Sequence, residues 1–246
     1  MRVQFLGTGD AFGSGGRFNT CFLVDRGARK FLIDCGASAM IAMRKFGVDP
    51  NAIDAIVLSH LHGDHFGGLP FFILDAQFVS RRRAPLVIAG PQGLATRLET
   101  LMEAMFPGMW EKQREFPIAL VEIEAQTSTP VGPEGPRVTG FPVKHPSGAT
   151  SFALRIDCDG KTIAFTGDTE WVDILIEVGR DADLFISECY MDERAVPNHL
   201  SFATLKERLP ECGARRIVLT HMPAEMLQLR SVAPFERAED GMEITI

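Results

Sequence analysis

The sequence predicts a layered fold of β-sheets and α-helices, in the α/β (α+β) class. Short apolar runs with many β-branched residues recur along the chain, and segments with helical spacing separate some of them. Strands and helices alternate in an irregular order, which is typical of sheets covered by helices. The chain has 246 residues, 46% of them hydrophobic, and can therefore bury a sizeable core.

The elements follow from these patterns in chain order. The runs predicted as strands are residues 3–6, 21–24, 30–33, 55–58, 86–89, 118–123, 138–143, 152–156, 162–165, 184–186, 216–219 and 242–246. The segments predicted as helices are residues 37–46, 68–79, 92–106, 171–178 and 202–209. Residues 126–136 are rich in Thr, Pro and Gly, and we interpret them as a surface loop because candidate site residues lie on both sides. We therefore expect one domain over residues 1–246.

Charge and cysteine content narrow the function classes. The net charge is −7, whereas proteins that grip long nucleic acids usually carry a basic excess. The basic run Arg81-Arg82-Arg83 is interpreted as a solvated turn after a helix.

No apolar run reaches the roughly 18 residues that a bilayer span needs, and the N-terminus does not resemble a signal peptide. The five cysteines form no CxxC pair, which indicates reduced thiols. We expect a soluble, cytoplasmic protein with no membrane partner.

The densest chemical signal is residues 59–65, with the sequence SHLHGDH. Three imidazoles and one carboxylate fall within six positions. Imidazole nitrogen and carboxylate oxygen are the ligands that zinc and its first-row neighbours accept. Alternate side chains, His60 and His62, can point to one centre, while Asp64 and His65 turn to a second. This segment therefore predicts a metal site.

Further candidate ligands follow predicted strands. His60 and His221 come directly after apolar runs. His145 is separated from a third apolar run by one lysine, and Asp168 follows a fourth apolar run. Strand ends are places where a rigid sheet can hold site residues while loops supply access. We expect these four side chains to meet in the folded chain.

Together these residues resemble the metallo-β-lactamase superfamily over nearly the whole chain. Residues 60–65 match the signature His-x-His-x-Asp-His, and three later ligands follow in the family order. The resemblance implies an αββα sandwich of two mixed β-sheets flanked by helices, with a dinuclear metal site at one edge. It also implies which residues hold the ions: His60, His62 and His145 for the first, Asp64, His65 and His221 for the second, and Asp168 between both. A histidine at position 62, where the oxygen-reducing branch has glutamate, favours the hydrolytic branch.

His199 indicates a branch within the superfamily. It lies in residues 198–201, NHLS, which resemble the His-x-Ser element of ribonuclease Z and the related cyclic-phosphate phosphodiesterases. Ser201 is the predicted N-cap of the following helix. In those proteins the matching histidine is not a metal ligand but works beside the signature aspartate at the scissile phosphate. The resemblance thus makes Asp64 and His199 the candidate catalytic residues.

One departure bears on the substrate. Ribonuclease Z enzymes of the short form carry a long tRNA-binding arm between the third and fourth motifs. Here 22 residues separate His145 from Asp168, and two predicted strands occupy much of that span. No room remains for an arm, and this favours a smaller phosphodiester.

We therefore expect a dinuclear metal-dependent phosphodiesterase that acts on a small or cyclic phosphodiester through a hydroxide shared by two metal ions. One alternative is an arm-less tRNA 3′-processing endonuclease with RNA as its partner. Another is a hydrolase of a different ester, thioester or lactone. A non-enzymatic metal-binding module is the weakest alternative, because an added acid–base residue exceeds what storage needs. We expect zinc as the cofactor, with manganese, nickel or iron as alternatives, and a homodimer by analogy with relatives.

Overall fold

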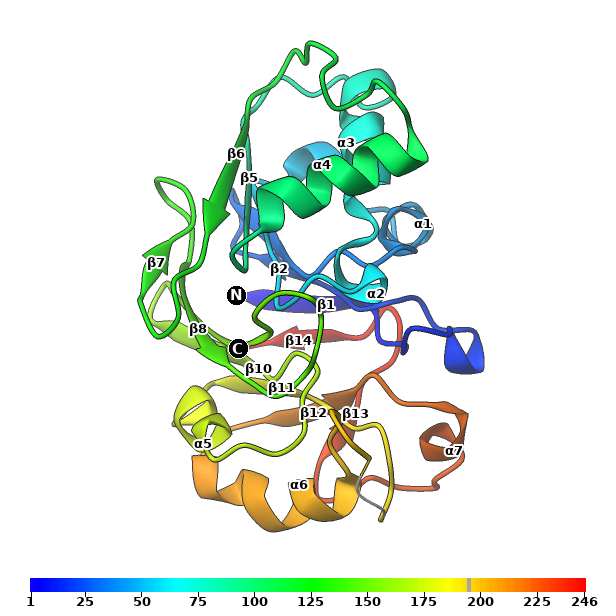
Figure 1. Cartoon of the computed structure of the whole chain (residues 1–246). Helices are drawn as coiled ribbons and strands as arrows, with labels where there is room; N and C mark the ends of the chain where they lie inside the picture. Colours follow the sequence, from blue (N-terminus) through cyan, green and yellow to red (C-terminus); the bar gives the residue numbers. More distant parts are fainter. Residues whose placement is uncertain (194–195) are drawn as a thin grey trace.

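Two β-sheets pack face to face in the computed structural model, which describes residues 1–193 and 196–246 (Figure 1). Within these residues each sheet has seven strands, and helices cover both outer faces. This arrangement confirms the predicted αββα sandwich of two mixed sheets.

The first sheet contains the N-terminal strands and the last strand of the chain. Its strands are β1 (Arg2–Gly7), β2 (Cys21–Asp25), β3 (Lys30–Ile33), β4 (Ala55–Val57), β5 (Leu86–Gly90), β6 (Ile118–Glu122) and β14 (Glu243–Thr245). They lie in the order β14-β1-β2-β3-β4-β5-β6, antiparallel from β14 to β3 and parallel from β3 to β6. The helices between them are α1 (Ala39–Lys45), α2 (Gly63–Phe66), α3 (Leu69–Phe78) and α4 (Leu94–Met105).

The second sheet contains the C-terminal strands. Its strands are β7 (Thr129–Pro130), β8 (Arg137–Pro142), β9 (Phe152–Cys158), β10 (Lys161–Phe165), β11 (Leu184–Glu188), β12 (Ile217–Thr220) and β13 (Glu236–Arg237). They are antiparallel from β7 to β10 and parallel from β10 to β13. The helices of this half are α5 (Ile174–Gly179), α6 (Phe202–Arg208) and α7 (Ala224–Leu227), and 3-10 turns cover Ser14–Gly16, Pro50–Ala52 and Leu209–Cys212.

Apolar side chains fill the space between the sheets and the space under each helical layer. Strands that are buried on both faces read as continuous apolar runs, which is why β4, β5, β11 and β12 are visible in the sequence. Phe22 of β2 meets Phe165 of β10 edge to face, with ring centroids 5.3 Å apart, and this contact joins the two sheets. At α6, the Ser201 side chain accepts a hydrogen bond from the Thr204 backbone amide, as predicted for its N-cap.

The carboxyl ends of several strands meet at one edge of the sandwich. β4, β10 and β12 end directly before the segments that carry His60, Asp168 and His221, and β8 ends before the segment that carries His145. Parallel strands place their carboxyl ends on the same side of a sheet, so the topology itself gathers these side chains.

Some elements differ from the sequence predictions. Residues 63–66 form the short helix α2, which is not among the predicted helices, and the predicted loop 126–136 contains the two-residue strand β7. β13 was not predicted either, since a two-residue strand leaves no periodic signal. Among the described residues, no helix has both the length and the apolar character needed to cross a membrane.

Arg82 corrects the interpretation of residues 81–83 as a solvated turn. Arg81 and Arg83 are exposed, but the Arg82 side chain is buried. Its guanidinium donates hydrogen bonds to the carbonyl oxygens of Ile53 (2.7 Å) and Pro85 (2.8 Å), among others. A buried cation is tolerated here because several backbone carbonyl acceptors surround its donors.

Replacement of Arg82 by methionine should lower the free energy of unfolding by about 3 kcal/mol, because several buried carbonyl groups would lose a charged donor. Urea unfolding followed by circular dichroism measures this change. The matched control is Arg83→Met, which removes an exposed ion pair with Glu115 and should cost less than about 1 kcal/mol. Equal losses in the two variants would contradict the structural role of Arg82.

Candidate metal centre

The signature segment reaches the site edge through α2. His60 and Leu61 extend from β4, His62 is the N-cap of α2, and Asp64 and His65 lie within this helix. The change from extended to helical backbone turns the two halves of the segment in different directions. Leu61 is buried and anchors the turn between them.

The first group of side chains consists of three imidazoles. His145 Nε2 lies 3.0 Å from His62 Nδ1, and the ring of His60 is 4.9 Å from that of His145 between centroids. One nitrogen from each of the three rings lies within 4.8 Å of the others. Burial lowers the pKa of all three imidazoles, so they stay neutral, which is the form that coordinates a metal ion.

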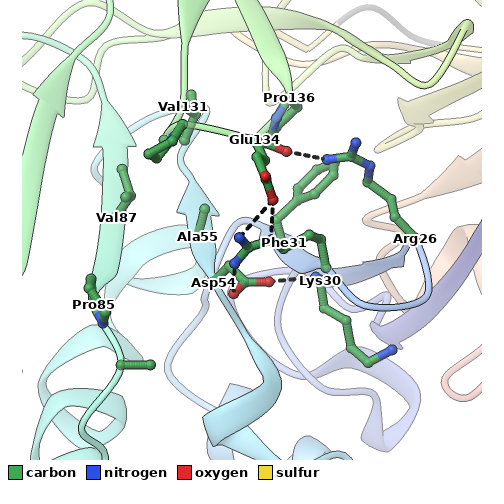
Figure 2. Close-up of a pocket in the computed structure, with 15 residues that line it drawn as sticks. Arg26, Lys30, Phe31, Asp54, Ala55, Pro85, Val87, Val131, Glu134 and Pro136 are labelled. Atoms are coloured by element: carbon green, nitrogen blue, oxygen red, sulfur yellow. Dashed lines mark hydrogen bonds and ion pairs between the residues drawn. The ribbon is translucent and has the colours of Figure 1, made fainter.

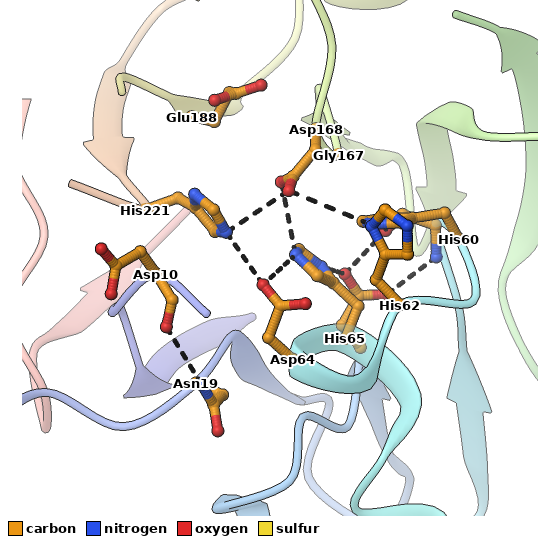
Figure 3. A network of polar contacts seen from close by, with 12 residues as sticks. Asp10, Asn19, His60, His62, Asp64, His65, Gly167, Asp168, Glu188 and His221 are labelled. Carbon is orange, nitrogen blue, oxygen red and sulfur yellow. Dashed lines mark hydrogen bonds and ion pairs between the residues drawn. The ribbon is translucent and has the colours of Figure 1, made fainter. Parts of the chain in front are cut away.

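The second group contains carboxylates (Figure 3). His65 Nε2 lies 3.3 Å from Asp64 Oδ2 and 3.3 Å from Asp168 Oδ1. His221 Nε2 lies 3.2 Å from Asp64 Oδ2 and 3.4 Å from Asp168 Oδ2. The four ligand atoms fall within 4.8 Å of one another.

Asp168 lies between the two groups. Its Oδ2 is 3.8 Å from His145 Nε2 and 3.9 Å from His60 Nε2, in addition to its contacts with the second group. The structure thus brings together all seven side chains that the sequence identified as candidate ligands, with Asp168 facing both groups.

The carboxylates of the second group stabilise positive charge near them. Burial alone would lower the pKa of His65, but the carboxylates of Asp168 and Asp64 raise it well above its ordinary value. Burial likewise opposes ionisation of Asp168, yet His221 and His65 hold the pKa of that carboxyl well below its usual range. In this environment a proton or a cation is stabilised between the carboxylates.

The unpaired polar atoms of the cluster fit a metal ion. Among the described residues, His60 Nε2, His65 Nε2 and Asp168 Oδ1 are buried without a hydrogen-bond partner. An unpartnered buried nitrogen or oxygen is costly. Convergent nitrogen and oxygen donors of this kind are the ligand set of zinc and related divalent ions. The residues present therefore fit a divalent metal site.

Hydrogen bonds orient the imidazoles. Asp34 Oδ2 lies 2.6 Å from His65 Nδ1, and the carbonyl of Asn198 lies 3.0 Å from His145 Nδ1. A ring that donates from Nδ1 directs the lone pair of Nε2 into the cluster. Asp34 itself is fixed, because it accepts hydrogen bonds from the backbone and the hydroxyl of Ser59, each at 2.7 Å.

Local backbone geometry supports these positions. Asp34 and His221 have positive φ angles of 58° and 56°. Non-glycine residues rarely adopt this region, and those that do are often found at functional sites. Gly36 is required for a different reason: a Cβ atom at this position would lie 2.2 Å from the carbonyl oxygen of Asp64. The loop after β3 can therefore pack closely against α2.

His199 lies beside the cluster and is held by Glu188. His199 Nδ1 is 2.9 Å from Glu188 Oε2, and the His199 ring is 5.1 Å from that of His145. Glu188 is buried at the end of β11, where burial and Asp168 raise its pKa well above the ordinary value. Burial lowers the pKa of His199.

Sequence reasoning missed Glu188 and Asp34. Both are carboxylates at the carboxyl end of a predicted strand, in the same context as Asp168. That shared context was the available signal, but no motif distinguishes these two from the other acidic residues of the chain.

A cavity of about 300 Å³ lies at the amino-terminal ends of β3, β4 and β5 (Figure 2). Its walls include Phe31, Val87 and Val131. Arg29 and Glu134 also line it and form an ion pair of 2.8 Å. Because none of the predicted site residues line this cavity, it is separate from the metal centre.

Known proteins resemble the chain over its full length. It is 28% identical to a ribonuclease Z of Haloferax volcanii, covering 100% of this chain and 95% of that protein. It is 28% identical to the probable metallo-hydrolase YhfI of Bacillus subtilis, covering 91% and 87%. The crystal structure of human tRNase Z, short form, superposes with a TM-score of 0.80 at 25% identity, covering 100% of this chain and 99% of that one.

The sandwich, the cluster and these relatives define a metal-dependent hydrolase of the metallo-β-lactamase superfamily with a ribonuclease Z-like relationship. This confirms the superfamily predicted from the signature segment and the branch predicted from His199. The chain belongs to the family of the anti-Pycsar protein Apyc1, whose sequence model matches residues 1–239.

Asp34→Asn should weaken zinc binding about 10- to 100-fold, because an amide has one acceptor oxygen and cannot accept from both the Ser59 amide and the His65 Nδ1, whose hydrogen bond directs Nε2 into the cluster. Zinc per chain, measured by mass spectrometry after dialysis against graded chelator, tests this expectation. Asp159→Asn is the matched control, since Asp159 is an exposed carboxylate at the β9–β10 turn. Unchanged zinc retention in Asp34→Asn would show that Asp34 does not support the metal site.

Proposed function

We propose that this protein is a dinuclear metal-dependent phosphodiesterase that hydrolyses a small or cyclic phosphodiester. The position of His199 carries the proposal. One of its ring nitrogens lies within 4.8 Å of ligand atoms of His145 and Asp168, and its Nδ1 is held by Glu188. A histidine that is fixed beside a metal site, and is not needed to complete it, is suited to exchange a proton with a substrate.

Zinc is the proposed metal, with manganese, nickel or iron as alternatives that accept the same donors. The proposed ligands are His60, His62 and His145 for one ion, Asp64, His65 and His221 for the other, and Asp168 for both. When bound, two divalent cations supply positive charge to the oxygens of a phosphoester and lower the pKa of water to near neutrality.

Asp64 and His199 perform the proton transfers in this proposal. Asp64 extends from α2 with Oδ2 between His65 and His221, where it orients and deprotonates water. His199 stabilises the phosphate or protonates the leaving oxygen. The hydrogen bond between its Nδ1 and Glu188 Oε2 leaves Nε2 free for the substrate.

The small size of the substrate is supported by the segment between His145 and Asp168. β9 (Phe152–Cys158) and β10 (Lys161–Phe165) occupy most of this segment and pair as an antiparallel hairpin. The segment therefore supplies no protruding arm. The net charge of −7 also disfavours a long polyanionic substrate.

An arm-less tRNA 3′-processing endonuclease is the second candidate, with RNA as the partner. Its support is the similarity to proteins named ribonuclease Z over the whole chain. Hydrolysis of another ester, thioester or lactone is a third candidate, because two metal ions also polarise carbonyl groups.

A substrate panel should separate these candidates. The purified protein is assayed with bis-p-nitrophenyl phosphate, 2′,3′-cyclic nucleotides, precursor tRNA and a thioester, each with zinc or manganese. We expect kcat/KM for the small phosphodiesters to exceed that for the thioester and the tRNA by about 100-fold or more, since the site then stabilises only the phosphoryl transition state. Specific cleavage of precursor tRNA at higher kcat/KM would favour the second candidate.

His199→Ala is the companion variant in the same assay. Phosphodiesterase turnover should fall by a factor of about 100 or more, because a general acid is lost, while both metal ions stay bound. Metal content measured on the same sample separates this outcome from loss of the site. Unchanged turnover would refute the proposed role of His199.

We also propose a cytoplasmic location. All five cysteines are buried free thiols, and burial raises the pKa of Cys35 and of Cys189 well above the ordinary value. Buried thiols that stay protonated and unpaired are typical of proteins in a reducing compartment.

A homodimer is the proposed assembly, formed through the apolar surface on α1 and α3. Ile41, Phe71, Phe78 and Val79 are exposed on this surface. A twofold-symmetric contact pairs one surface with itself, so the surface must complement its own charges. Arg44 forms an ion pair with Asp75 on the same surface, which gives it both signs of charge.

Phe78→Glu should convert the dimer to a monomer, because it would bury a charge in the apolar contact. Sedimentation velocity at micromolar concentration measures the mass. Phe12→Glu is the matched control, since Phe12 is 83% exposed but lies between β1 and β2, away from this surface. A monomeric native protein, or a Phe78→Glu variant that remains dimeric, would contradict the proposed contact.

A further inference from the structure

Tyr190 lies at the metal centre next to His199, and neither the signature nor the proposed ligand set includes it. It is two residues beyond the end of β11 and is partly exposed. Its backbone amide donates a hydrogen bond of 2.9 Å to the carbonyl of Leu200, and the amide of Met191 donates to the same carbonyl. The backbone that carries Tyr190 is therefore fixed to the backbone that carries His199.

The Tyr190 ring lies flat on the His199 ring. The ring centroids are 4.4 Å apart, and the planes are inclined by 25°. The ring of His221 lies farther away, 6.1 Å from Tyr190 and inclined by 42°. Among the described residues, the Tyr190 hydroxyl makes no hydrogen bond, so the ring is the part of this side chain that contacts the site.

Two contacts of different direction are needed to fix an imidazole. The hydrogen bond between His199 Nδ1 and Glu188 holds one atom of the ring in its plane. The ring can still tilt by small rotations about its Cα–Cβ and Cβ–Cγ bonds, which bend this hydrogen bond without breaking it and would move Nε2 away from the substrate. A flat ring stacked on one face opposes the rotation, because tilting the imidazole would lose the stacked contact.

We infer that Tyr190 is the positioning residue for His199, and that its stacked ring, not its hydroxyl, keeps Nε2 of His199 directed at the substrate phosphate. The inference rests on the proposed function only for the role of His199 in turnover. The inference depends on two contacts of His199: Tyr190 stacks on the face of its ring, and Glu188 forms a hydrogen bond in the plane of the ring. Neither contact depends on the substrate.

The test compares Tyr190→Ala, Tyr190→Leu and Tyr190→Phe in the zinc-loaded protein with a 2′,3′-cyclic nucleotide and with bis-p-nitrophenyl phosphate. We expect kcat of the alanine and leucine variants to fall about tenfold with the cyclic nucleotide, while KM and metal content stay unchanged. Tyr190→Phe should keep kcat within about twofold of the native value. The loss should be smaller with bis-p-nitrophenyl phosphate, whose leaving group needs little protonation.

A double variant separates positioning from an independent role. In a His199→Ala background, Tyr190→Ala should have no further effect on kcat, because the residue that it positions is absent. Phe106→Leu is the control for loss of an aromatic pair elsewhere, since Phe106 contacts Phe71 edge to face. This variant should leave kcat unchanged. A Tyr190→Phe variant as slow as Tyr190→Ala, or a full tenfold loss in the His199→Ala background, would overturn the inference.

A crystal structure of zinc-loaded Tyr190→Leu supplies a readout that needs no activity. The His199 imidazole should occupy more than one orientation there, whereas a single orientation with Nδ1 on Glu188 would overturn the inference. Failure of the native protein to hydrolyse any phosphodiester would instead count against the proposed function. The two failures are therefore distinguishable.

Discussion

The structure depends on a buried cluster of nitrogen and oxygen donors that cannot satisfy one another. His60 Nε2, His65 Nε2 and Asp168 Oδ1 are buried without partners among the described residues. His65 Nε2 lies 3.3 Å from Asp168 Oδ1, a distance at which two unprotonated acceptors repel. Such an arrangement is stable only with positive charge inside it, from protons or from metal ions. Much of the surrounding structure, including the left-handed backbone of Asp34 and His221, keeps these donors in place.

The two halves of the cluster are chemically different, and the difference organises the site. The His60, His62 and His145 group is neutral, because burial keeps its imidazoles unprotonated. The Asp64, His65 and His221 group carries carboxylate charge. Glu188 and His199 form a separate hydrogen-bonded pair next to both. A site with one group of imidazoles alone, one group that includes carboxylates and an adjacent histidine can divide charge stabilisation and proton transfer between different residues, as the proposed function requires.

The sequence predicted the parts of the structure that local patterns encode. Apolar runs located most strands, and the strand-end positions of His145, Asp168 and His221 predicted that distant side chains would meet. Burial of Arg82 was not predictable, because three adjacent arginines look alike until the carbonyls of Ile53 and Pro85 are placed around one of them. Asp34, Glu188 and Tyr190 act through partners far along the chain, and single residues leave no periodic signal.

The origin of the cluster in both sheets has a mechanical consequence. His60, His62, Asp64 and His65 follow β4 of the first sheet, whereas His145, Asp168 and His221 follow β8, β10 and β12 of the second. A cation bound by side chains from both sheets would link the two sheets at one edge, as a reversible crosslink would. The free energy of ion binding is then shared with the docking of one layer on the other. Loss of the ions would loosen that edge first and leave the opposite edge comparatively rigid, because apolar packing and the ion pair between Arg26 and Asp159 join the layers there.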